Sequence, residues 1–396
     1  MFINKVIFMG TMKEILEKLN PWWNEEFNFK SIERKKYLDI LKEQIDKKDI
    51  NILTGIRRVG KTTLMYQLIN FLLERKVNPK NILFLSLDVI YFKDYFIQDI
   101  ISEYMKLNRI SNKEKVYLFL DEITYKDNFN QELKNLYDFG NYAVFASSSS
   151  AKVLKDKKAF LTGRARYYEI HPLDFEEFCV FKGHSFKSNL PVLKSLFEEY
   201  MKMGGMPEFV LTKNPSYLSE LLELIVSKDI VMEHDLKNKQ LIFDLFRLLC
   251  ERVGKQISYN KLSKILDVDN ETVSKYVSYF LDTYLFDLIE IKGKLNQRIL
   301  GKKKLYCIDV GLRNVVTGFK DLGSVYENLV YHVIKGEKPN FIYVDGMEID
   351  FCFKDVLIEA KYGVVLEGKQ KEFFDSLKFK KKIVANGVDF FLEKKC

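Results

Sequence analysis

The chain of 396 residues has little of what stabilises disulfide-rich or zinc-binding folds. Its five cysteines lie far apart without a C-x-x-C pair, and its four histidines show no metal-ligand spacing, so we expect neither disulfides nor zinc. It has no charge-free apolar run of about 18 residues, which argues against a membrane-spanning helix. The first residues carry too short an apolar run for a signal peptide. We therefore expect a cytoplasmic protein that does not enter a membrane.

Proline and flexible linkers are also scarce. With seven prolines and no Ser/Gly-rich tract, the chain is predicted to be folded nearly throughout. Its net charge of +8, from 63 basic and 55 acidic residues, is a moderate excess that suits a polyanionic partner. A general compositional bias toward lysine explains the same excess, so the charge alone does not decide between partners.

Hydrophobic patterning divides the chain into blocks. From about residue 30 to 175, apolar β-like runs alternate with amphipathic helical stretches, which predicts a parallel sheet with crossover helices. The pattern is helical from about 176 to 300, and short strands return around a helix beyond 304. We expect an α/β protein with a parallel-sheet core, a helical middle and a small α/β domain at its end.

The most specific motif stands between a strand-like run and a helix-like stretch. It fits G-x-x-x-x-G-K-[ST], in which backbone N–H groups and the positive end of a helix surround a phosphate. Lys61 would neutralise the β- and γ-phosphates, and the Thr62 hydroxyl would bind Mg²⁺. The alternative, a glycine turn without nucleotide, does not account for this context. The predicted nucleotide-binding residues are Gly55, Ile56, Arg57, Arg58, Val59, Gly60, Lys61, Thr62 and Thr63.

An acidic pair follows another apolar run, about 60 residues after this loop. The run from Val116 to Leu120 predicts a buried parallel strand, and Asp121 and Glu122 stand at its carboxyl end, where open α/β sheets bind ligands. Asp121 would hold Mg²⁺ through water, and Glu122 would polarise the attacking water. The pair predicts hydrolysis of ATP rather than binding alone.

Two more polar groups flank strand-like runs. Four serines follow Tyr142 to Ala146, and Ser148 is the predicted contact of the γ-phosphate, with a plain serine turn as the alternative. Arg164 and Arg166 precede Tyr167 to Ile170. Either arginine would reach the γ-phosphate of a neighbouring subunit and stabilise transition-state charge there. An ion-paired surface arginine is the alternative reading.

These segments resemble an AAA+-type ATPase family of archaea and bacteria that is related to the signal-transduction ATPases with numerous domains. The resemblance rests on GIRRVGKTT, LFLDEI and GRARYYEIHPLDFEEF. It implies a P-loop AAA+ core at 1–175, a helical lid at 176–240, ATP and Mg²⁺ as cofactors, and a homo-oligomer such as a hexamer. It also implies that Pro21-Trp22-Trp23 and Arg34 pack near the adenine. Pro207, in the lid element Gly204-Gly205-Met206-Pro207, would approach the base.

Two helical stretches with a tight polar turn between them begin at residues 257 and 269 and run into a β-like end near Leu288. This order is typical of a winged helix, which we expect at 241–300. The second helix carries polar side chains that would face a DNA groove. Many winged helices only join domains or bind protein, so that alternative stays open. The groove-facing candidates are Thr272, Ser274, Lys275 and Tyr276.

The last block, 301–396, predicts a short strand and then helix, three strands, helix and strand. Glu359 and Lys361 share one strand face, and Asp350 lies one hairpin away. Two carboxylates and a lysine at one edge can hold Mg²⁺ and orient a water against a phosphodiester. This arrangement resembles the PD-(D/E)xK nuclease superfamily. The resemblance makes Glu327 the helix acid, Asp350 and Glu359 metal ligands and Lys361 the water-positioning base. A nuclease-like fold without cleavage is the alternative.

Together these patterns favour an Mg²⁺-dependent AAA+ ATPase that remodels or processes DNA, with a nuclease-like tail that binds or cuts it. The rival hypothesis is a signalling or defence switch, in which the nucleotide state controls protein partners and the nuclease-like domain is inactive.

Overall fold

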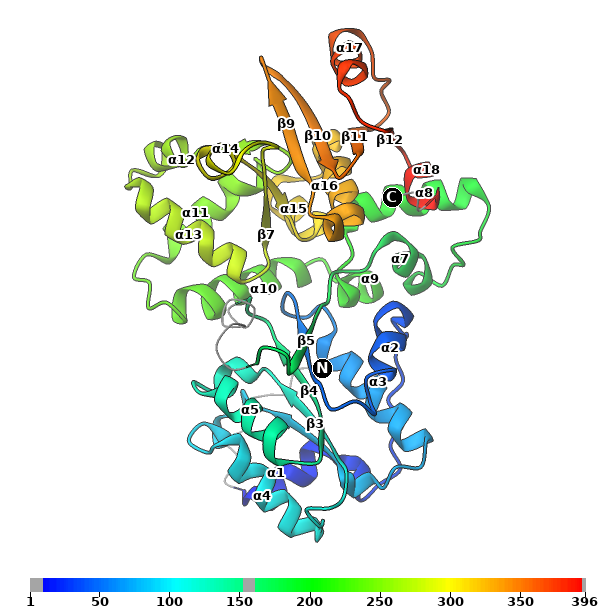
Figure 1. Cartoon of the computed structure of the whole chain (residues 1–396), viewed down its shortest axis with the longest axis vertical. Coiled ribbons are helices and arrows are strands. Elements are labelled where there is room, and N and C mark those ends of the chain that lie inside the picture. The colour runs from blue at the N-terminus through cyan, green and yellow to red at the C-terminus, as the bar shows by residue number, and fades with distance from the viewer. Residues whose placement is uncertain (1–9, 152–160, 394–396) are drawn as a thin grey trace. The chain divides into compact units, whose positions relative to one another are not determined.

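A computed structural model describes residues 10–151 and 161–393. The chain divides into two compact units, the first ending at Ile170 and the second beginning at His171 (Figure 1). No helix within these described ranges has both the length and the apolar character to cross a membrane.

The first unit is an α/β layer structure. Its helices are α1 (Met12–Leu19), α2 (Lys35–Lys42), α3 (Lys61–Glu74), α4 (Ile97–Asn108) and α5 (Phe129–Phe139), with short 3₁₀ turns η1 (Pro21–Trp23), η2 (Pro79–Asn81), η3 (Ile90–Phe92) and η4 (Ile123–Tyr125). Its strands are β1 (Ile50–Thr54), β2 (Ile82–Ser86), β3 (Val116–Asp121), β4 (Tyr142–Ser148) and β5 (Ala165–Glu169).

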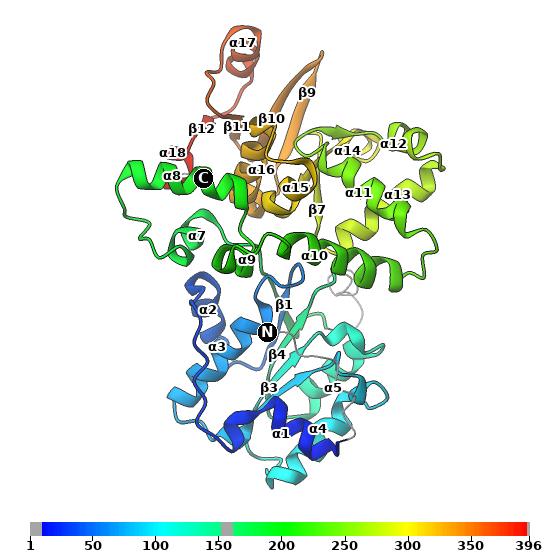
Figure 2. The same ribbon diagram turned by 180° about the vertical axis from the view of Figure 1, so that it is seen from behind.

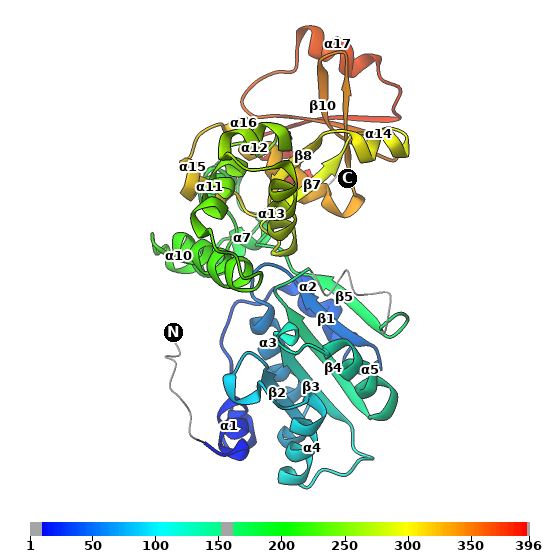
Figure 3. The ribbon, with the colours of Figure 1, turned by 90° about the vertical axis from the view of Figure 1, so that its left-hand side faces the viewer.

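The five strands form one parallel sheet in the order β2-β3-β4-β1-β5. Helices α2 and α3 cover one face and α4 and α5 cover the other (Figures 1 and 3). Every residue of β1 and β3 is buried, as the continuous apolar runs predict for strands covered on both faces. The parallel core expected from the sequence is therefore present, and it brings the carboxyl ends of β1, β3 and β4 to one edge.

The second unit holds the remaining elements. Its helices are α7 (Phe175–Phe181), α8 (Leu190–Met203), α9 (Pro207–Thr212), α10 (Tyr217–Leu224), the π-helical η6 (Ile225–Met232), α11 (Lys239–Cys250), α12 (Tyr259–Leu266), α13 (Asn270–Asp282), α14 (Leu295–Leu300), α15 (Val310–Thr317), α16 (Leu322–Ile334), η7 (Lys335–Glu337), α17 (Gly368–Ser376) and α18 (Asp389–Glu393). Its strands are β6 (Gln256–Ile257), β7 (Phe286–Glu290), β8 (Lys303–Cys307), β9 (Asn340–Val344), β10 (Met347–Phe353), β11 (Val356–Lys361) and β12 (Lys381–Asn386).

A three-stranded antiparallel sheet in the order β6-β8-β7 lies beside α11, α12 and α13. The start of α13 is set by Asp269, whose carboxylate accepts hydrogen bonds from the backbone N–H and the hydroxyl of Thr272. The chain order is helix, strand, helix, helix, strand, strand, with α14 inserted between the last two strands.

A four-stranded sheet in the order β12-β11-β10-β9 completes the unit. Helix α16 lies against β11 (Figure 2). Apolar side chains on one face of this sheet join a core with α8 and α16, and a smaller cluster on the other face includes Phe374 of α17. A bulge between Ile349 and Cys352 shifts the register of β10 around Asp350.

One expected boundary needs correction. The sequence assigns the strand near Leu305 to the last domain, 301–396, but β8 pairs with β6 and β7 and so completes the sheet of the preceding segment. The predicted helical lid, the 241–300 segment and the last block all lie in the second compact unit. Hydrophobic patterning does not predict such shared cores, because periodicity shows which residues are buried but not which elements they pack against.

Candidate functional site

The phosphate-binding motif forms a tight loop between β1 and α3. Gly55 has φ +141°, and a Cβ there would lie 2.2 Å from the carbonyl oxygen of Ile170, so only glycine fits. Gly60 has φ +102° and caps α3, while Arg58 takes a left-handed conformation with φ +63°. The loop therefore turns its backbone sharply into the positive end of a fourteen-residue helix, the geometry that binds anions.

Lys61, the first residue of α3, is buried inside this loop. Its ammonium donates to the carbonyl oxygens of Gly55 at 2.9 Å and Ile56 at 3.2 Å. The Arg34 side chain, also buried, donates to the carbonyl oxygen of Val59 at 3.0 Å and so braces the loop from the chain that precedes the sheet. The cations at this loop thus come from both the motif and the lead-in.

The acidic pair lies beside the loop, as its place after β3 predicts. The Thr62 hydroxyl donates to an Asp121 oxygen at 2.7 Å, and the Ser147 hydroxyl donates to the other oxygen. Burial, followed by the neighbouring Glu122 carboxylate, raises the pKa of Asp121. A threonine hydroxyl next to a buried carboxylate is a hard-oxygen donor set that fits Mg²⁺, so Thr62 and Asp121 would hold the ion.

Glu122 is held in a left-handed conformation with φ +54° at the end of the strand. Its carboxylate accepts from the hydroxyl of Ser149 at 2.9 Å and from the backbone N–H of Ser149 at 3.2 Å. Burial opposes its ionisation, but the charges of Lys61 and Arg57 and the bonds from Ser149 outweigh burial and lower the pKa of Glu122. The side chain is an ionised, oriented carboxylate that can polarise water.

Two residues of the serine cluster contact the acidic pair, and the predicted contact of Ser148 with the γ-phosphate stays a prediction. Ser147 and Ser149 touch Asp121 and Glu122, whereas the Ser148 hydroxyl lies 3.3 Å from that of Thr124 and bonds the backbone of Ser150. Because side chains alternate along a strand, 147 and 149 share the face that 148 avoids. Alternation groups Ser147 with Ser149 in the sequence, but only the structure shows that their face meets the acids.

The tryptophans of the lead-in contact the edge strand β2, and their expected packing near the adenine stays a prediction. The indole N–H groups of Trp22 and Trp23 donate to the carbonyl oxygen of Ile82, at 3.1 and 2.8 Å. Ile82 begins β2, whereas the phosphate loop lies where parallel strands end. The two tryptophans therefore cover the amino end of the edge strand, while Arg34 of the lead-in contacts the loop.

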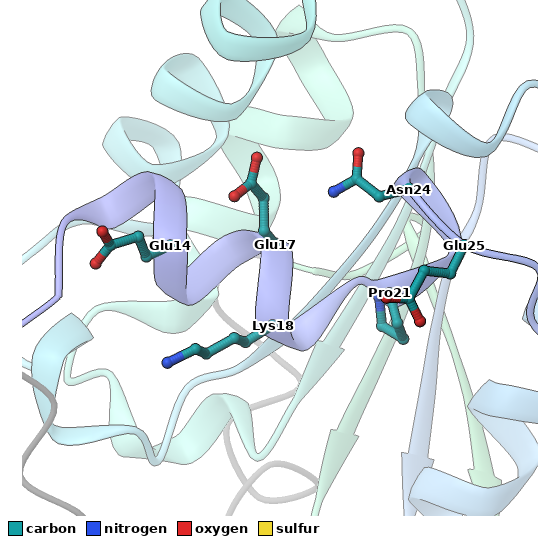
Figure 4. A pocket seen from close by; sticks show the side chains of 6 residues that line it. All are labelled: Glu14, Glu17, Lys18, Pro21, Asn24 and Glu25. Atoms are coloured by element: carbon teal, nitrogen blue, oxygen red, sulfur yellow. The ribbon is translucent and has the colours of Figure 1, made fainter.

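A shallow hollow between α1 and η1 lies in this lead-in region (Figure 4). Its mixed lining offers no set of phosphate-binding groups, and we assign it no role. It is lined by Glu14, Glu17, Lys18, Pro21, Asn24 and Glu25.

The four predicted nuclease residues do converge in the second unit. The Lys361 ammonium lies 2.8 Å from Glu359, the Asp350 backbone N–H donates to Glu359, and Glu327 approaches from α16. The sequence did not reveal Lys304, whose ammonium lies 2.7 Å from Glu327 and 2.8 Å from Asp350. A cation of the chain therefore contacts two of these carboxylates, Glu327 and Asp350, and a metal site at Asp350 and Glu359 stays a prediction.

Comparison with known proteins supports part of this picture. A family described as "AAA domain" matches residues 47–179, which contain the loop, the acidic pair and the serines. These residues form an AAA-type domain. A family described as "Domain of unknown function (DUF8612)" matches residues 194–323, from within α8 to the start of α16.

Relatives of similar length carry no assigned function. An uncharacterized protein of Methanocaldococcus jannaschii, MJ1544, is 29% identical over 361 residues, covering 82% of this chain and 77% of the relative. An uncharacterized protein of Haemophilus influenzae is 29% identical over 342 residues, covering 81% and 83%. A solved structure of Drosophila ORC bound to AT-rich DNA and Cdc6 covers 76% of this chain and 92% of its own, at 15% identity and a TM-score of 0.24. At that TM-score the likeness says nothing about function.

Within the AAA-type domain, the two candidate arginines make ion pairs of their own. Arg164 pairs with Asp138 at 3.1 Å and Arg166 pairs with Asp49, with side chains 34% and 54% exposed. Exposed pairs of this kind are weak, so they would not prevent either arginine from changing partner. A role toward a neighbouring subunit stays a prediction.

Pro207 belongs to the second unit and begins α9, and its approach to the base stays a prediction. The turn before it is fixed by a residue that the sequence did not single out. The buried Asp309 carboxylate accepts from the Gly205 N–H at 2.6 Å and from the Leu312 N–H at 3.0 Å. Asp309 therefore ties the predicted lid turn to the residues that follow β8.

Proposed function

We propose that the chain is a cytoplasmic, Mg²⁺-dependent ATPase that uses ATP hydrolysis to remodel DNA bound by its second unit. The observation that carries the ATPase part is the constellation of Lys61, Thr62, Asp121 and Glu122 around one loop. Lys61 would neutralise the phosphates, and the ionised Glu122 would take the proton of the attacking water. When bound, Mg²⁺ would stabilise charge on the phosphate oxygens.

The DNA part is supported by topology and charge together. The strand order β6-β8-β7 with α11, α12 and α13 agrees with a winged helix. The segment between β7 and β8, residues 291–302, contains four basic residues and no acidic one. Lys292, Lys294, Arg298 and Lys302 in this segment are exposed, which suits contact with phosphates.

The test is DNA binding measured against salt concentration. Replacing Lys294 and Lys302 together by alanine should weaken binding at every sequence and reduce the slope of log K against log salt by about 2, because two phosphate contacts are lost. The matched control replaces Lys106 and Lys113, two exposed lysines of the AAA-type domain, and should leave the slope unchanged. Binding that is insensitive to salt, or equally weakened by both pairs, would refute the proposal.

A second candidate is a nucleotide-controlled switch with protein partners. The observation that favours it is apolar exposure on α14, where Leu295, Ile299 and Leu300 are 65%, 61% and 86% exposed. ATP turnover that DNA does not change, together with loss of partner binding when these three residues become serine, would support the switch. In both candidates we propose a homo-oligomer, such as a hexamer, with Arg164 or Arg166 acting between subunits.

A further inference from the structure

Lys304 is a lysine with no solvent exposure at all. Its ammonium lies 2.7 Å from Glu327, 2.6 Å from Glu348 and 2.8 Å from Asp350, and its side chain is 0% exposed. An ammonium has three N–H donors, and three carboxylates surround this one. Lys304 comes from β8, while its partners come from α16 and β10, so the group joins the three-stranded sheet to the four-stranded one.

The three carboxylates also receive hydrogen bonds from other protein groups. The Tyr306 hydroxyl donates to Glu327 at 2.6 Å, the Gln256 amide donates to Glu348 at 2.7 Å, and the Ala360 backbone N–H donates to Asp350 at 2.9 Å. Each carboxylate therefore has a hydrogen-bond donor besides the ammonium, as buried charges require.

The space between Glu327 and Asp350 does not suit a divalent cation. Across the described ranges, no group of three or more His, Cys, Asp or Glu side chains is arranged to hold a metal ion. A divalent cation between Glu327 and Asp350 would have to share that space with the Lys304 ammonium. Two positive charges in one buried site repel each other strongly, so lysine and metal exclude one another.

We propose that Lys304 takes the place of a divalent cation among Glu327, Glu348 and Asp350. The cluster is then a metal-independent ionic clasp between β8, α16 and β10 rather than a cleavage centre. The clasp goes beyond the proposed ATPase and holds whether or not the second unit binds DNA. The ion pairs of the clasp give Glu327 and Asp350, two residues of the nuclease-like motif, a structural role without metal chemistry.

The first arm of the test measures Mn²⁺ binding to nucleotide-free protein by electron paramagnetic resonance. Wild type and Asp350→Asn should bind the same number of ions, because the cluster holds none. An ion that wild type binds and Asp350→Asn loses would overturn the proposal. This arm uses the intact chain and does not depend on how any lysine variant folds.

The second arm replaces Lys304 by alanine, with Lys303→Ala as the matched control. Lys303 is the neighbouring residue of β8, and its ammonium instead pairs with Glu290 at 3.0 Å. Lys304→Ala should lower the Tm of the second unit by roughly 10 °C, since it leaves buried carboxylates without their counter-ion. It should also gain one Mn²⁺ site whose occupancy restores most of that loss.

Lys303→Ala should shift the Tm by no more than a few degrees. It should leave the number of bound Mn²⁺ ions unchanged. A folded Lys304→Ala chain that keeps the wild-type Tm, or that gains no Mn²⁺ site, would overturn the clasp. DNA is absent throughout, so failure of the DNA proposal leaves this test unaffected.

Discussion

A methyl group at Gly55 should disrupt the phosphate loop by a steric clash with the neighbouring backbone. An alanine Cβ would stand 2.2 Å from the Ile170 carbonyl oxygen, and the two atoms must separate by about 1 Å to reach an ordinary van der Waals distance. Ile170 follows β5, and its N–H donates to the carbonyl oxygen of Thr54 at 2.7 Å. Moving Ile170 away therefore breaks the last hydrogen bond between β5 and β1.

The free-energy cost of Gly55→Ala can be estimated from the lost hydrogen bond and from the strained backbone conformation. Leaving a buried carbonyl of Thr54 unpaired costs about 1–3 kcal/mol, and holding alanine at φ +141° costs about 1–3 kcal/mol. We expect Gly55→Ala to lower the free energy of unfolding of the first unit by about 4 kcal/mol and to abolish ATP binding. Gly163→Ala is the control, since its φ is +75° but its Cβ would meet open space, and it should cost about 1–2 kcal/mol.

Urea unfolding followed by tryptophan fluorescence isolates the relevant unit. The only two tryptophans of the chain, Trp22 and Trp23, both lie in the first unit. Fluorescent ATP analogues would measure binding in parallel. The reasoning is refuted if Gly55→Ala unfolds at the same urea concentration as Gly163→Ala and still binds nucleotide.

Three further predictions follow from single contacts. Ser149→Ala removes a hydrogen bond that lowers the pKa of Glu122, so the acidic limb of the ATPase pH profile should move to higher pH; Ser148→Ala should leave it in place. Asn20→Ala should destabilise the first unit by about 3 kcal/mol in the same urea assay, because the buried Asn20 amide bonds both the N–H and the carbonyl of a β2 residue, and a smaller loss would contradict that role. Burial raises the pKa of Asp309 to about 6 from 3.8, so the folded chain holds a proton that the unfolded chain releases between these values. The free energy of unfolding should therefore fall by about 3 kcal/mol as pH rises through that window, and Asp309→Asn should remove that part of the slope.

The sequence predicted most reliably those functional residues that stand next to one another in the chain. The loop from Gly55 to Thr63 and the Asp121-Glu122 pair each lie at a strand end, and a parallel sheet brings strand ends to one edge. Their proximity therefore follows from local pattern and fold class alone. The predicted order of helix and strands around Asp350 and Glu359 is likewise observed.

What the sequence could not provide depends on register and on distant partners. Choosing Ser147 and Ser149 over Ser148 requires knowing which strand face meets the acids. Lys304 lies 23 residues before Glu327 and 46 before Asp350, and in so lysine-rich a chain nothing marks it as buried. Long-range ion pairs of this kind produce no periodic pattern in the sequence, because tertiary structure and not the neighbouring residues brings the partners together.

The central claim is that ATP bound beside Lys61 is hydrolysed with Glu122 as the base, and that DNA stimulates this hydrolysis. The most direct measurement is steady-state phosphate release with Mg²⁺, with and without double-stranded DNA, for wild type and Glu122→Gln. We predict DNA-stimulated turnover in wild type and a loss of about 10²–10⁴-fold in Glu122→Gln, with ATP binding retained. Turnover that survives Glu122→Gln, or a wild-type chain that binds ATP without hydrolysing it, would contradict the account.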